Sequence, residues 1–414
     1  MKRIILLLFL IQISLLLHGQ IIADHTVVDK FDDIPQSYIN EVRKMWLVYP
    51  GESHSSAIRR GLLNLEIDNP VYAVSVVEEG TPESYTTAHL RASRATWGNY
   101  ENESGWIYSY GEEDWFTNAT AIARTKAGIT YCNTHNLVIA AIGFGWCGDM
   151  LGGNYTAAAD PVYGCRWAGH SVYGPDDNRA WGLDAEDYGI TGNSVSMDSY
   201  LSATQQYIDY CKANGYATNV FLTTGPVDSE STWGGESGYQ GHIKHEYIRD
   251  YAGADPGRIL FDYADILCYN DNGEASTITW NGHTYPSIHS DNMEGGTTGH
   301  IGITGALRLA KAMWWMLARM AGWDGVTSTG IDELYKDKSL SPKIEITENE
   351  LRISMDYSSQ DVAVNLYNLH GGLMASDRAY NNTCILNISG LPTGIYLVTL
   401  QNSKNICTKK VFIR

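Results

Sequence analysis

The sequence predicts an α/β fold, a three-layer α/β/α sandwich around a parallel sheet, followed by a small all-β sandwich domain. Over roughly residues 40–325, apolar runs alternate with helical patterns, an order typical of parallel strands joined by helices. Beyond Thr327 the pattern changes: short runs of alternating apolar and polar residues, typical of strands, are separated by turn residues. At 414 residues the chain has room for both domains.

The N-terminus has the organisation of a secretory signal peptide. Lys2 and Arg3 precede an apolar run that ends near Gly19. We therefore expect a signal peptide at 1–20 and a mature chain that begins between Gln20 and Asp24. No other segment approaches a membrane-spanning length, so export without stable membrane insertion is expected. The predicted organisation continues with a large domain at 24–328, a polar linker at 329–340 and a small domain at 341–414.

The order of elements in the large domain follows from apolar runs and their boundaries. Strands are predicted where short apolar runs end at turn residues, and helices where the period is near 3.6. The expected strands are 45–49, 71–80, 137–145, 219–227 and 258–270; the expected helices are 56–66, 199–215 and 305–322. Region 81–118 is expected to be loop-like. The more than fifty residues before the 199–215 helix are irregular and polar, as in segments that shape a binding site.

Composition limits the partners and cofactors. The formal net charge of −18 argues against nucleic acid or an anionic membrane as the main partner. Seven cysteines without a CxxC pair do not indicate zinc, and their odd number leaves at least one thiol unpaired. Cys384 and Cys407 both fall in the small domain, where they are expected to be able to pair. No metal or other cofactor is expected.

Aromatic residues gather in the irregular regions of the large domain. Trp106 and Trp115 lie near acidic residues within 81–118, and Trp146 follows the predicted strand 137–145. Sugar rings stack on aromatic faces and hydrogen-bond to acids, so these tryptophans are candidate substrate-binding residues. Packing of buried aromatic side chains explains the same residues equally well.

The stretch "MWLVYPGESHS" at 45–55 predicts a strand that turns sharply into a helix. Such a turn places its last residues at the carboxyl end of the sheet, where helix amides also point. Ser53 is therefore a candidate nucleophile, with an ordinary helix N-cap at Ser53 or Ser55 as the alternative. His300, just before the closing helix, is the candidate general base.

This order of serine and histidine resembles that of the SGNH, or GDSL-like, hydrolases over roughly residues 40–325. The family's Gly-Asp-Ser block corresponds to Gly51-Glu52-Ser53 here, and Gly80 matches the glycine that follows the second strand. The resemblance implies that Ser53 is the nucleophile and His300 the base. It also implies that the backbone amides of Ser53 and Gly80 bind the oxyanion.

One departure concerns the oxyanion hole. The family's third block, Gly-x-Asn-Asp, is replaced by Gly143-Phe144-Gly145-Trp146-Cys147-Gly148-Asp149, which lacks the asparagine donor. Asn154 or Asn193 is a candidate substitute.

A second departure concerns the acid that orients the histidine. In the family's Asp-x-x-His block, the position three residues before His300 is Thr297. Asp291 or Glu294 from the preceding loop is a candidate acid; a backbone carbonyl or a Ser-His dyad without an acid is the alternative.

The small domain carries a second resemblance. "NLYNLHGG", "LPTGIYLVTL" and the ending "KKVFIR" resemble the sorting domain of the type IX secretion system of Bacteroidetes, over residues 341–414. This implies export to the cell surface or medium, with the secretion machinery as a partner. The alternative is an ordinary β-sandwich accessory module.

Together these features predict a secreted SGNH-type serine esterase that removes acyl (acetyl) groups from carbohydrate or polysaccharide. The first alternative is a non-catalytic carbohydrate-binding or cell-surface protein on a degenerate hydrolase scaffold. A second is a glycosidase that uses paired carboxylates such as Glu112 and Asp114. His242 and His245, one helical turn apart, are expected on a solvated helix face.

Overall fold

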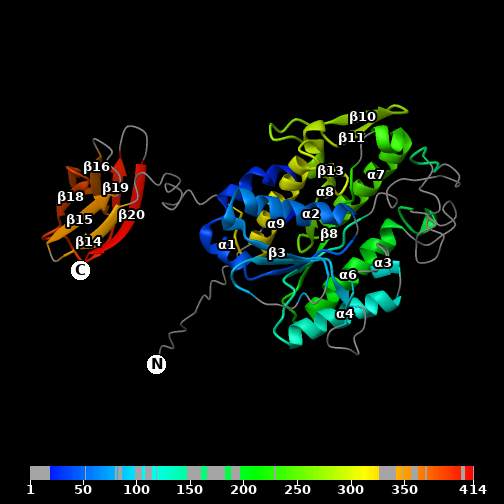
Figure 1. Cartoon of the computed structure of the whole chain (residues 1–414), viewed down its shortest axis with the longest axis horizontal. Coiled ribbons are helices and arrows are strands. Elements are labelled where there is room, and N and C mark those ends of the chain that lie inside the picture. Colours follow the sequence, from blue (N-terminus) through cyan, green and yellow to red (C-terminus); the bar gives the residue numbers. More distant parts are fainter. Residues whose placement is uncertain are drawn as a thin grey trace, which may run out of the picture. The chain divides into compact units, whose positions relative to one another are not determined.

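The chain divides into two compact units, Met1–Gly325 and Val326–Arg414. The computed structural model (Figure 1) describes residues 19–51, 53–79, 82, 86–97, 105–107, 114–117, 119–146, 160–165, 182–187, 196–227, 230–325, 342–347, 349–355, 362–368, 371–401 and 406–413. No helix in these ranges is both long enough and apolar enough to cross a bilayer.

The large unit is built on a seven-stranded sheet in which every neighbouring pair is parallel. Its strands, in spatial order, are β1 (Ile22–Ala23), β9 (Ile259–Phe261), β8 (Asn219–Thr223), β7 (Ala141–Ile142), β2 (Trp46–Val48), β4 (Leu90–Ser93) and β3 (Val74–Val77). Because all strands run in one direction, their carboxyl ends share one edge of the sheet, and that edge positions the candidate site.

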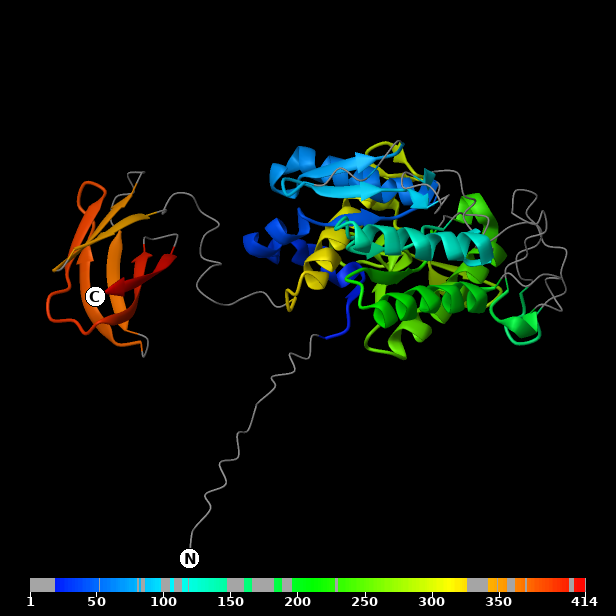
Figure 2. The ribbon, with the colours of Figure 1, turned by 90° about the horizontal axis from the view of Figure 1, so that it is seen from below.

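Helices cover both faces of this sheet (Figures 1 and 2). One face carries α1 (Gln36–Val42), α2 (Ser53–Asp68), α8 (Tyr263–Cys268) and α9 (Ile303–Met320). The other carries α3 (Asp114–Thr117), α4 (Ala119–Thr134), α6 (Met197–Asn214) and α7 (Glu230–Gly253). The parallel sheet and the helices on its two faces confirm the predicted α/β architecture.

The alternation of side chains along β2 explains the two cores. Leu47 and Tyr49 pack on the α2 and α9 side, whereas Trp46 and Val48 pack on the α4 and α6 side. Successive side chains of a strand point to opposite faces, so a strand covered on both sides is apolar throughout. This is why "MWLVY" is a continuous apolar run and not an alternating one.

The direction of the chain across the sheet reverses between β2 and β7. From β2 the chain crosses the α2 side to reach β3 and β4, and from β4 it crosses the α4 side to reach β7. Ligands of open parallel sheets bind outside the carboxyl ends of the strands at such a switch point. The loops after β2 and β7 meet there.

Two differences from the predicted elements bear on the site. The expected strand 71–80 is β3, but β4 arises from the region expected to be a loop and lies between β3 and β2. The expected strand 258–270 ends at Phe261 and continues as α8. Asp262 terminates the strand because its carboxylate accepts a hydrogen bond from the amide of Asp265 (3.2 Å) and caps the helix.

Helix α7 contains the glycine-rich stretch 234–241, which carried no helix prediction. Its glycines allow the hairpin of β10 (Thr277–Trp280) and β11 (His283–Pro286) to lie directly on the helix. A Cβ atom on Gly235 would lie 2.4 Å from the Trp280 ring, and one on Gly238 would lie 2.8 Å from the Tyr285 hydroxyl. Tertiary packing here outweighs the helix-propensity cost of about 1 kcal/mol per glycine. His245 on the same helix is 4% exposed, which corrects the expectation of a solvated helix face.

The folded part of the large unit includes residues ahead of the expected start at 24. Strand β1 pairs with β9, and the Gln20 side chain donates to the carbonyl of Ala252 (2.7 Å). Arg319 also donates to the carbonyl of Gly19 (3.0 Å). Residues 1–18 of the predicted signal peptide lie outside the described residues. A mature chain beginning near Gly19 retains this edge strand.

The small unit consists of two antiparallel sheets that enclose one core. The first holds β14 (Pro342–Ile346), β15 (Glu350–Met355) and β18 (Thr383–Asn387); the second holds β17 (Leu373–Arg378), β16 (Ala363–Asn368), β19 (Gly394–Gln401) and β20 (Ile406–Ile413). The expected pairing of Cys384 with Cys407 is wrong. Cys384 is a buried free thiol, and the two residues belong to strands of different sheets.

Candidate active site

Helix α2 begins at the switch point of the sheet. Its first residue is Ser53, five positions after the end of β2. The unpaired amides of a helix N-terminus favour negative charge, including the oxyanion that forms when an ester is attacked. The position of Ser53 in the fold therefore matches that of a nucleophile on a strand-to-helix turn; its side chain lies outside the described residues.

The turn that precedes α2 is held tightly against the loop after β7. The amide of Gly143 donates to the carbonyl of Val48 (3.2 Å), and the amide of Gly145 donates to that of Pro50 (2.8 Å). Gly51 has a φ of 121°, and a Cβ atom there would lie 2.9 Å from the carbonyl oxygen of Gly145. Only glycine fits this position, which explains the first residue of the Gly-Glu-Ser stretch.

Gly51→Ala is expected to destabilise the large unit. Both the backbone conformation and the contact with Gly145 oppose a Cβ atom, so the free energy of unfolding should fall by about 1–3 kcal/mol. The matched control is Gly215→Ala, where φ is also positive at 66° but no atom lies within 4 Å of the added Cβ. Chemical denaturation of both variants measures the difference. Equal losses would show that the Gly145 contact contributes nothing.

A buried arginine fixes the first turn of α2. Arg59 is 1% exposed and donates to Ser55 Oγ (3.0 Å), to the carbonyl of Tyr49 (2.9 Å) and to Glu78 (2.7 Å). Ser55 Oγ in turn donates to the carbonyl of Gly51 (2.6 Å). The Ser55 hydroxyl therefore holds the turn together. In the sequence, this role shows only as an arginine four residues after a serine within an apolar helix. No role was predicted from that spacing.

His300 occupies a two-residue hairpin turn between β12 (Thr297–Thr298) and β13 (Ile301–Gly302). Gly299 and His300 have φ values of 55° and 67°, as such a tight turn requires. Positive φ is uncommon for a residue other than glycine, and strain of this kind concentrates at functional sites. The exposed imidazole is carried on this turn immediately before α9.

The structure brings His300 to the first turn of α2. The rings of His54 and His300 stack with centroids 4.9 Å apart and an interplanar angle of 29°. Because His54 directly follows Ser53, the two residues predicted to form the catalytic pair belong to segments in contact with each other. Their separation in sequence is 247 positions, so only the fold creates this neighbourhood.

His54 is held neutral at this site. It is 6% exposed, and its ring meets the edge of the Tyr263 ring at 6.4 Å between centroids. Burial, and secondarily the nearby His300, lowers the pKa of His54 to about 3. Its Nδ1 atom has no hydrogen-bond partner in the described part of the chain. Of the two imidazoles, His300 is the exposed one.

The candidate acids lie close to His300 in sequence but make other contacts. Asp291 accepts a hydrogen bond from the side chain of Asn270 (3.2 Å) and lies 3.4 Å from Nδ1 of His289. Glu294 is exposed and follows the short helix Ser290–Met293. Among the described residues, no carboxylate forms a hydrogen bond or ion pair with His300, and Thr297 lies in β12. The predicted acid role of Asp291 or Glu294 stays a prediction.

The candidate oxyanion donors Gly80 and Asn154, and the substitute Asn193, lie outside the described residues. The topology nevertheless changes what is expected of Gly80. It follows β3, which is the outer strand, whereas the strand beside β2 is β4. Adjacent strands are about 4.8 Å apart, so the loop that begins at Arg94 after β4 emerges nearer to the α2 N-terminus than the loop after β3.

The candidate substrate-binding tryptophans serve mainly the core. Trp115 and Trp146 are 2% and 1% exposed; Trp115 stacks on Phe144 (3.9 Å), and Trp146 meets the Tyr200 ring edge (5.0 Å). Trp106 is partly buried against Trp46. A ring face covered by protein cannot stack on a sugar, so for Trp115 and Trp146 the packing interpretation replaces the substrate-binding one.

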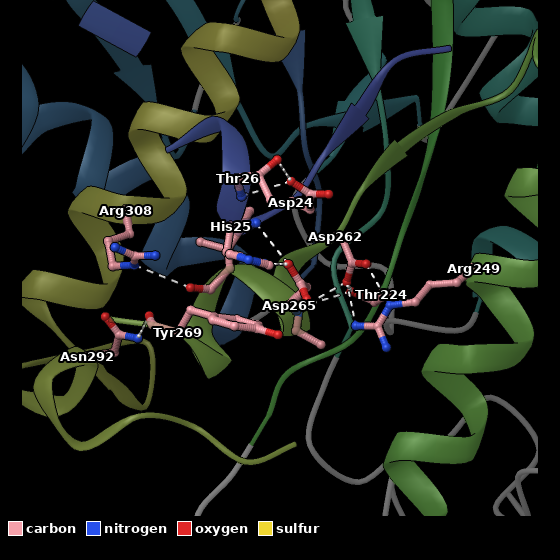
Figure 3. A network of polar contacts seen from close by, with 12 residues as sticks. Asp24, His25, Thr26, Thr224, Arg249, Asp262, Asp265, Tyr269, Asn292 and Arg308 are labelled. Atoms are coloured by element: carbon pink, nitrogen blue, oxygen red, sulfur yellow. Dashed lines mark hydrogen bonds and ion pairs between the residues drawn. The ribbon is translucent and has the colours of Figure 1, made fainter. Parts of the chain in front are cut away.

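A separate polar network lies at the carboxyl ends of β1, β8 and β9 (Figure 3). His25 Nδ1 lies 2.5 Å from Asp265 Oδ2, and its ring stacks on Tyr269 at 3.5 Å. One potential ligand atom each from Asp24, His25 and Asp265 lies within 4.8 Å of the others, a geometry that a metal ion requires. Asp24 also caps the turn at Thr26 (2.9 Å). The His25–Asp265 pair and the cap formed by Asp24 account for all three side chains.

Comparison with known families bears on the small unit. The model of the secretion system C-terminal sorting domain matches residues 347–414. The small unit is a sorting domain. The chain is accordingly a secreted or cell-surface protein and a client of the type IX secretion machinery.

The structure explains one motif of the sorting domain. In the stretch 391–396 the hydroxyl of Tyr396 donates to the carbonyl of Pro392 (2.7 Å) and closes the turn that leads into β19. Gly390, just before it, has a φ of 81°. The motif therefore encodes a fixed entry into the central strand pair of this domain.

Comparisons with curated proteins and with solved structures find only weak similarity. No curated protein matches the chain. Among solved structures, the BSP domain of a biofilm associated protein has 16% identity over 20% of this chain and 16% of that one (TM-score 0.17). A DUF3244 family protein from Bacteroides vulgatus with an immunoglobulin-like β-sandwich fold has 11% identity over 19% and 88% (TM-score 0.18). Similarities as weak as these do not indicate a function.

Proposed function

We propose that the large unit is a serine ester hydrolase of the SGNH type that removes acyl groups from carbohydrates. The observation that carries the proposal is the contact between His54 and His300 (4.9 Å), which joins the α2 N-terminus to the hairpin before α9. This contact brings a solvent-accessible imidazole close to a helix N-terminus that begins with a serine. Both lie at the switch point of a parallel sheet. The resemblance of Gly51-Glu52-Ser53 to the family's first block supports the same assignment.

In this mechanism the Ser53 hydroxyl attacks the acyl carbon while His300 accepts its proton. Backbone amides at the start of α2 stabilise the oxyanion of the tetrahedral intermediate. The bond between the acyl carbon and the sugar oxygen then breaks, His300 gives the proton to that oxygen so that the sugar leaves as an alcohol, and an acyl-serine remains. A water molecule, deprotonated by His300, hydrolyses this ester and restores Ser53. Neither step of this mechanism requires a cofactor.

The orientation of His300 in this proposal comes from its surroundings and not from a carboxylate. The turn between β12 and β13 fixes its backbone, and the neutral ring of His54 stacks against its ring. An orienting group restricts the imidazole to productive rotamers. A Ser-His dyad positioned by stacking is thus the arrangement that the described residues support best.

The experiment compares the secreted chain with Ser53→Ala and Ser56→Ala, using release of 4-nitrophenol from 4-nitrophenyl acetate and of acetate from acetylated xylan. Ser56 belongs to the same turn of α2 and is the matched control. Ser53→Ala should lower kcat/KM roughly 10³-fold or more, and Ser56→Ala should leave it nearly unchanged. Wild-type activity in Ser53→Ala would overturn the mechanism.

The alternative is a non-catalytic carbohydrate-binding protein on the same scaffold. Thr297 in place of the family's aspartate, and the absence of a carboxylate partner for His300 among the described residues, favour it. Under this alternative the wild-type chain hydrolyses neither ester, while it still retains acetylated polysaccharide in a pull-down that Ser53→Ala does not weaken.

A further inference from the structure

The outward face of the first sheet of the sorting domain, formed by β14, β15 and β18, is polar. Glu345 lies opposite Arg352, and Glu350 lies opposite Asn387. All four side chains are exposed and alternate along their strands with apolar residues that pack on the core. An antiparallel sheet with one face on the core and the other in water shows this alternation. The exposed Ile385 stands among these polar neighbours, opposite Arg352.

The outward face of the second sheet, by contrast, carries a band of apolar residues. Tyr367 of β16 lies opposite Leu373 of β17 on one side and opposite Leu397 of β19 on the other. Ile395, two residues before Leu397, lies opposite Phe412 of β20. Residues directly opposite in an antiparallel pair share a face, and the other face of this sheet is buried core. We call these five residues the outer apolar band.

The outer apolar band reaches both edges of its sheet. In β17, the register with β16 shifts between Leu366 and Tyr367, so Met374 has no residue opposite it. This β-bulge places Met374, 36% exposed, beside Leu373, 56% exposed. At the other edge, Phe412 is 52% exposed. Edge strands are ordinarily protected by charge or by a covering segment, so apolar edges of this kind indicate a surface that a partner covers.

The size of the outer apolar band favours a transient partner over a second copy of the chain. A stable dimer buries about 800 Å² and roughly 20–30 residues on each side. The band and Met374 together supply only six side chains. A client of a secretion system is released after transport, and a small apolar contact allows that release.

The charges on this face favour a protein over an anionic membrane. By register, the outward positions of the four described strands hold two basic residues, Arg378 and Lys410. Recognition of anionic lipid takes clusters of about four to eight basic residues. Beside the band, the outward positions are uncharged and polar, as at Asn365 and the opposite Thr399. An apolar centre with a polar rim is the composition of a protein–protein contact.

We propose that the outer apolar band is the surface by which a protein component of the type IX secretion machinery holds this chain during transport. The family match gives the class of partner, because the band lies within residues 347–414 of the sorting domain. The contact fits an apolar loop or strand, which can also pair with the edge of β17 that is open in the described part of the chain. The proposal concerns the small unit and does not depend on the reaction of the large one.

The test measures export of the full chain from a Bacteroidetes host that has a type IX secretion system. The variant combines Tyr367→Thr, Leu397→Thr and Phe412→Thr, because threonine favours strands while removing most of the apolar surface. The matched control is Ile385→Thr, which removes an exposed apolar side chain from the polar face of the other sheet. Immunoblots compare the chain outside the cells with the chain retained in the periplasm.

The triple variant should lower the exported fraction roughly tenfold or more, whereas Ile385→Thr should leave it at the wild-type level. Export of the triple variant at the wild-type level would overturn the proposal. Resistance of the small unit to limited proteolysis verifies that each variant is folded. If the triple variant is not, Phe412→Thr alone replaces it and should lower export roughly threefold.

A second experiment identifies what covers the surface. A photo-crosslinking phenylalanine analogue replaces Leu373 in one chain and Ile385 in another, and the products formed during export are identified by mass spectrometry. A product with a component of the secretion machinery from position 373 and none from position 385 supports the proposal. A product between two copies of this chain, or no product from position 373, would refute it. Binding of the purified wild type to phospholipid vesicles, if lost in the triple variant, would refute it in favour of a membrane.

Discussion

Replacing His300 by asparagine is expected to lower esterase kcat roughly 10²–10⁴-fold without lowering the stability of the protein. Asparagine tolerates the positive φ of 67° at this turn, so the hairpin of β12 and β13 remains intact while the base is removed. Alanine at the same position would confound the loss of the base with backbone strain. Steady-state hydrolysis of 4-nitrophenyl acetate, with thermal unfolding measured beside it, separates the two effects.

The matched control is His289→Asn. His289 accepts a hydrogen bond from the amide of Asp291 through Nδ1 (3.2 Å), and asparagine retains such a cap. This variant loses an imidazole from the same region without touching the stacked pair. Added imidazole should restore part of the rate to His300→Asn and none to Ser53→Ala. A His300→Asn variant as active as His289→Asn would refute the base assignment.

Acidification is expected to destabilise the large unit through His54. Its pKa is about 3 in the folded protein, below the ordinary value of 6.5 that it regains on unfolding. Between these two values the unfolded chain binds a proton that the native chain does not, so the free energy of unfolding falls as the pH falls. The stabilisation, fully present above pH 6.5, is lost toward pH 3 and amounts to roughly 5 kcal/mol over the whole window.

The measurement is urea unfolding of the wild type and of His54→Phe at several pH values between 7 and 4. Phenylalanine keeps a stacked ring but has no proton to bind, so this variant should lose much less stability on acidification. Carboxylates titrate in both proteins, and the difference between the two curves isolates the imidazole. His135→Phe, at an exposed histidine, should follow the wild type. Parallel curves for wild type and His54→Phe would contradict the prediction.

Several parts of this protein are determined by local sequence. The apolar run at 45–49, the αL glycine that ends α6 at Gly215 and the apolar pattern of α9 each specify an element through short-range chemistry. The sorting domain likewise carries its identity in contiguous stretches such as 391–396. For the same reason, the turn around Ser53 was enough to predict it as a candidate nucleophile.

Other parts depended on contacts between distant residues. Strand β4 was missed because its segment is only four residues long and contains Arg91 and Ser93, and it becomes a strand only by pairing with β2 and β3. The glycine-rich first half of helix α7 was missed because its glycines oppose a helix locally and are favoured only where β10 and β11 approach. The burial of Trp115 and His245 also follows from packing that no local pattern encodes.

The sequence alone therefore determined the layered α/β unit, the sorting domain and the two residues of the candidate pair. Only the tertiary structure decided that His54 stacks on His300, that His54 is held neutral, and that His245 is buried. The physical reason is that strand and helix signals are periodic and local. The neighbourhood of an imidazole, by contrast, is set by chain segments more than two hundred residues apart.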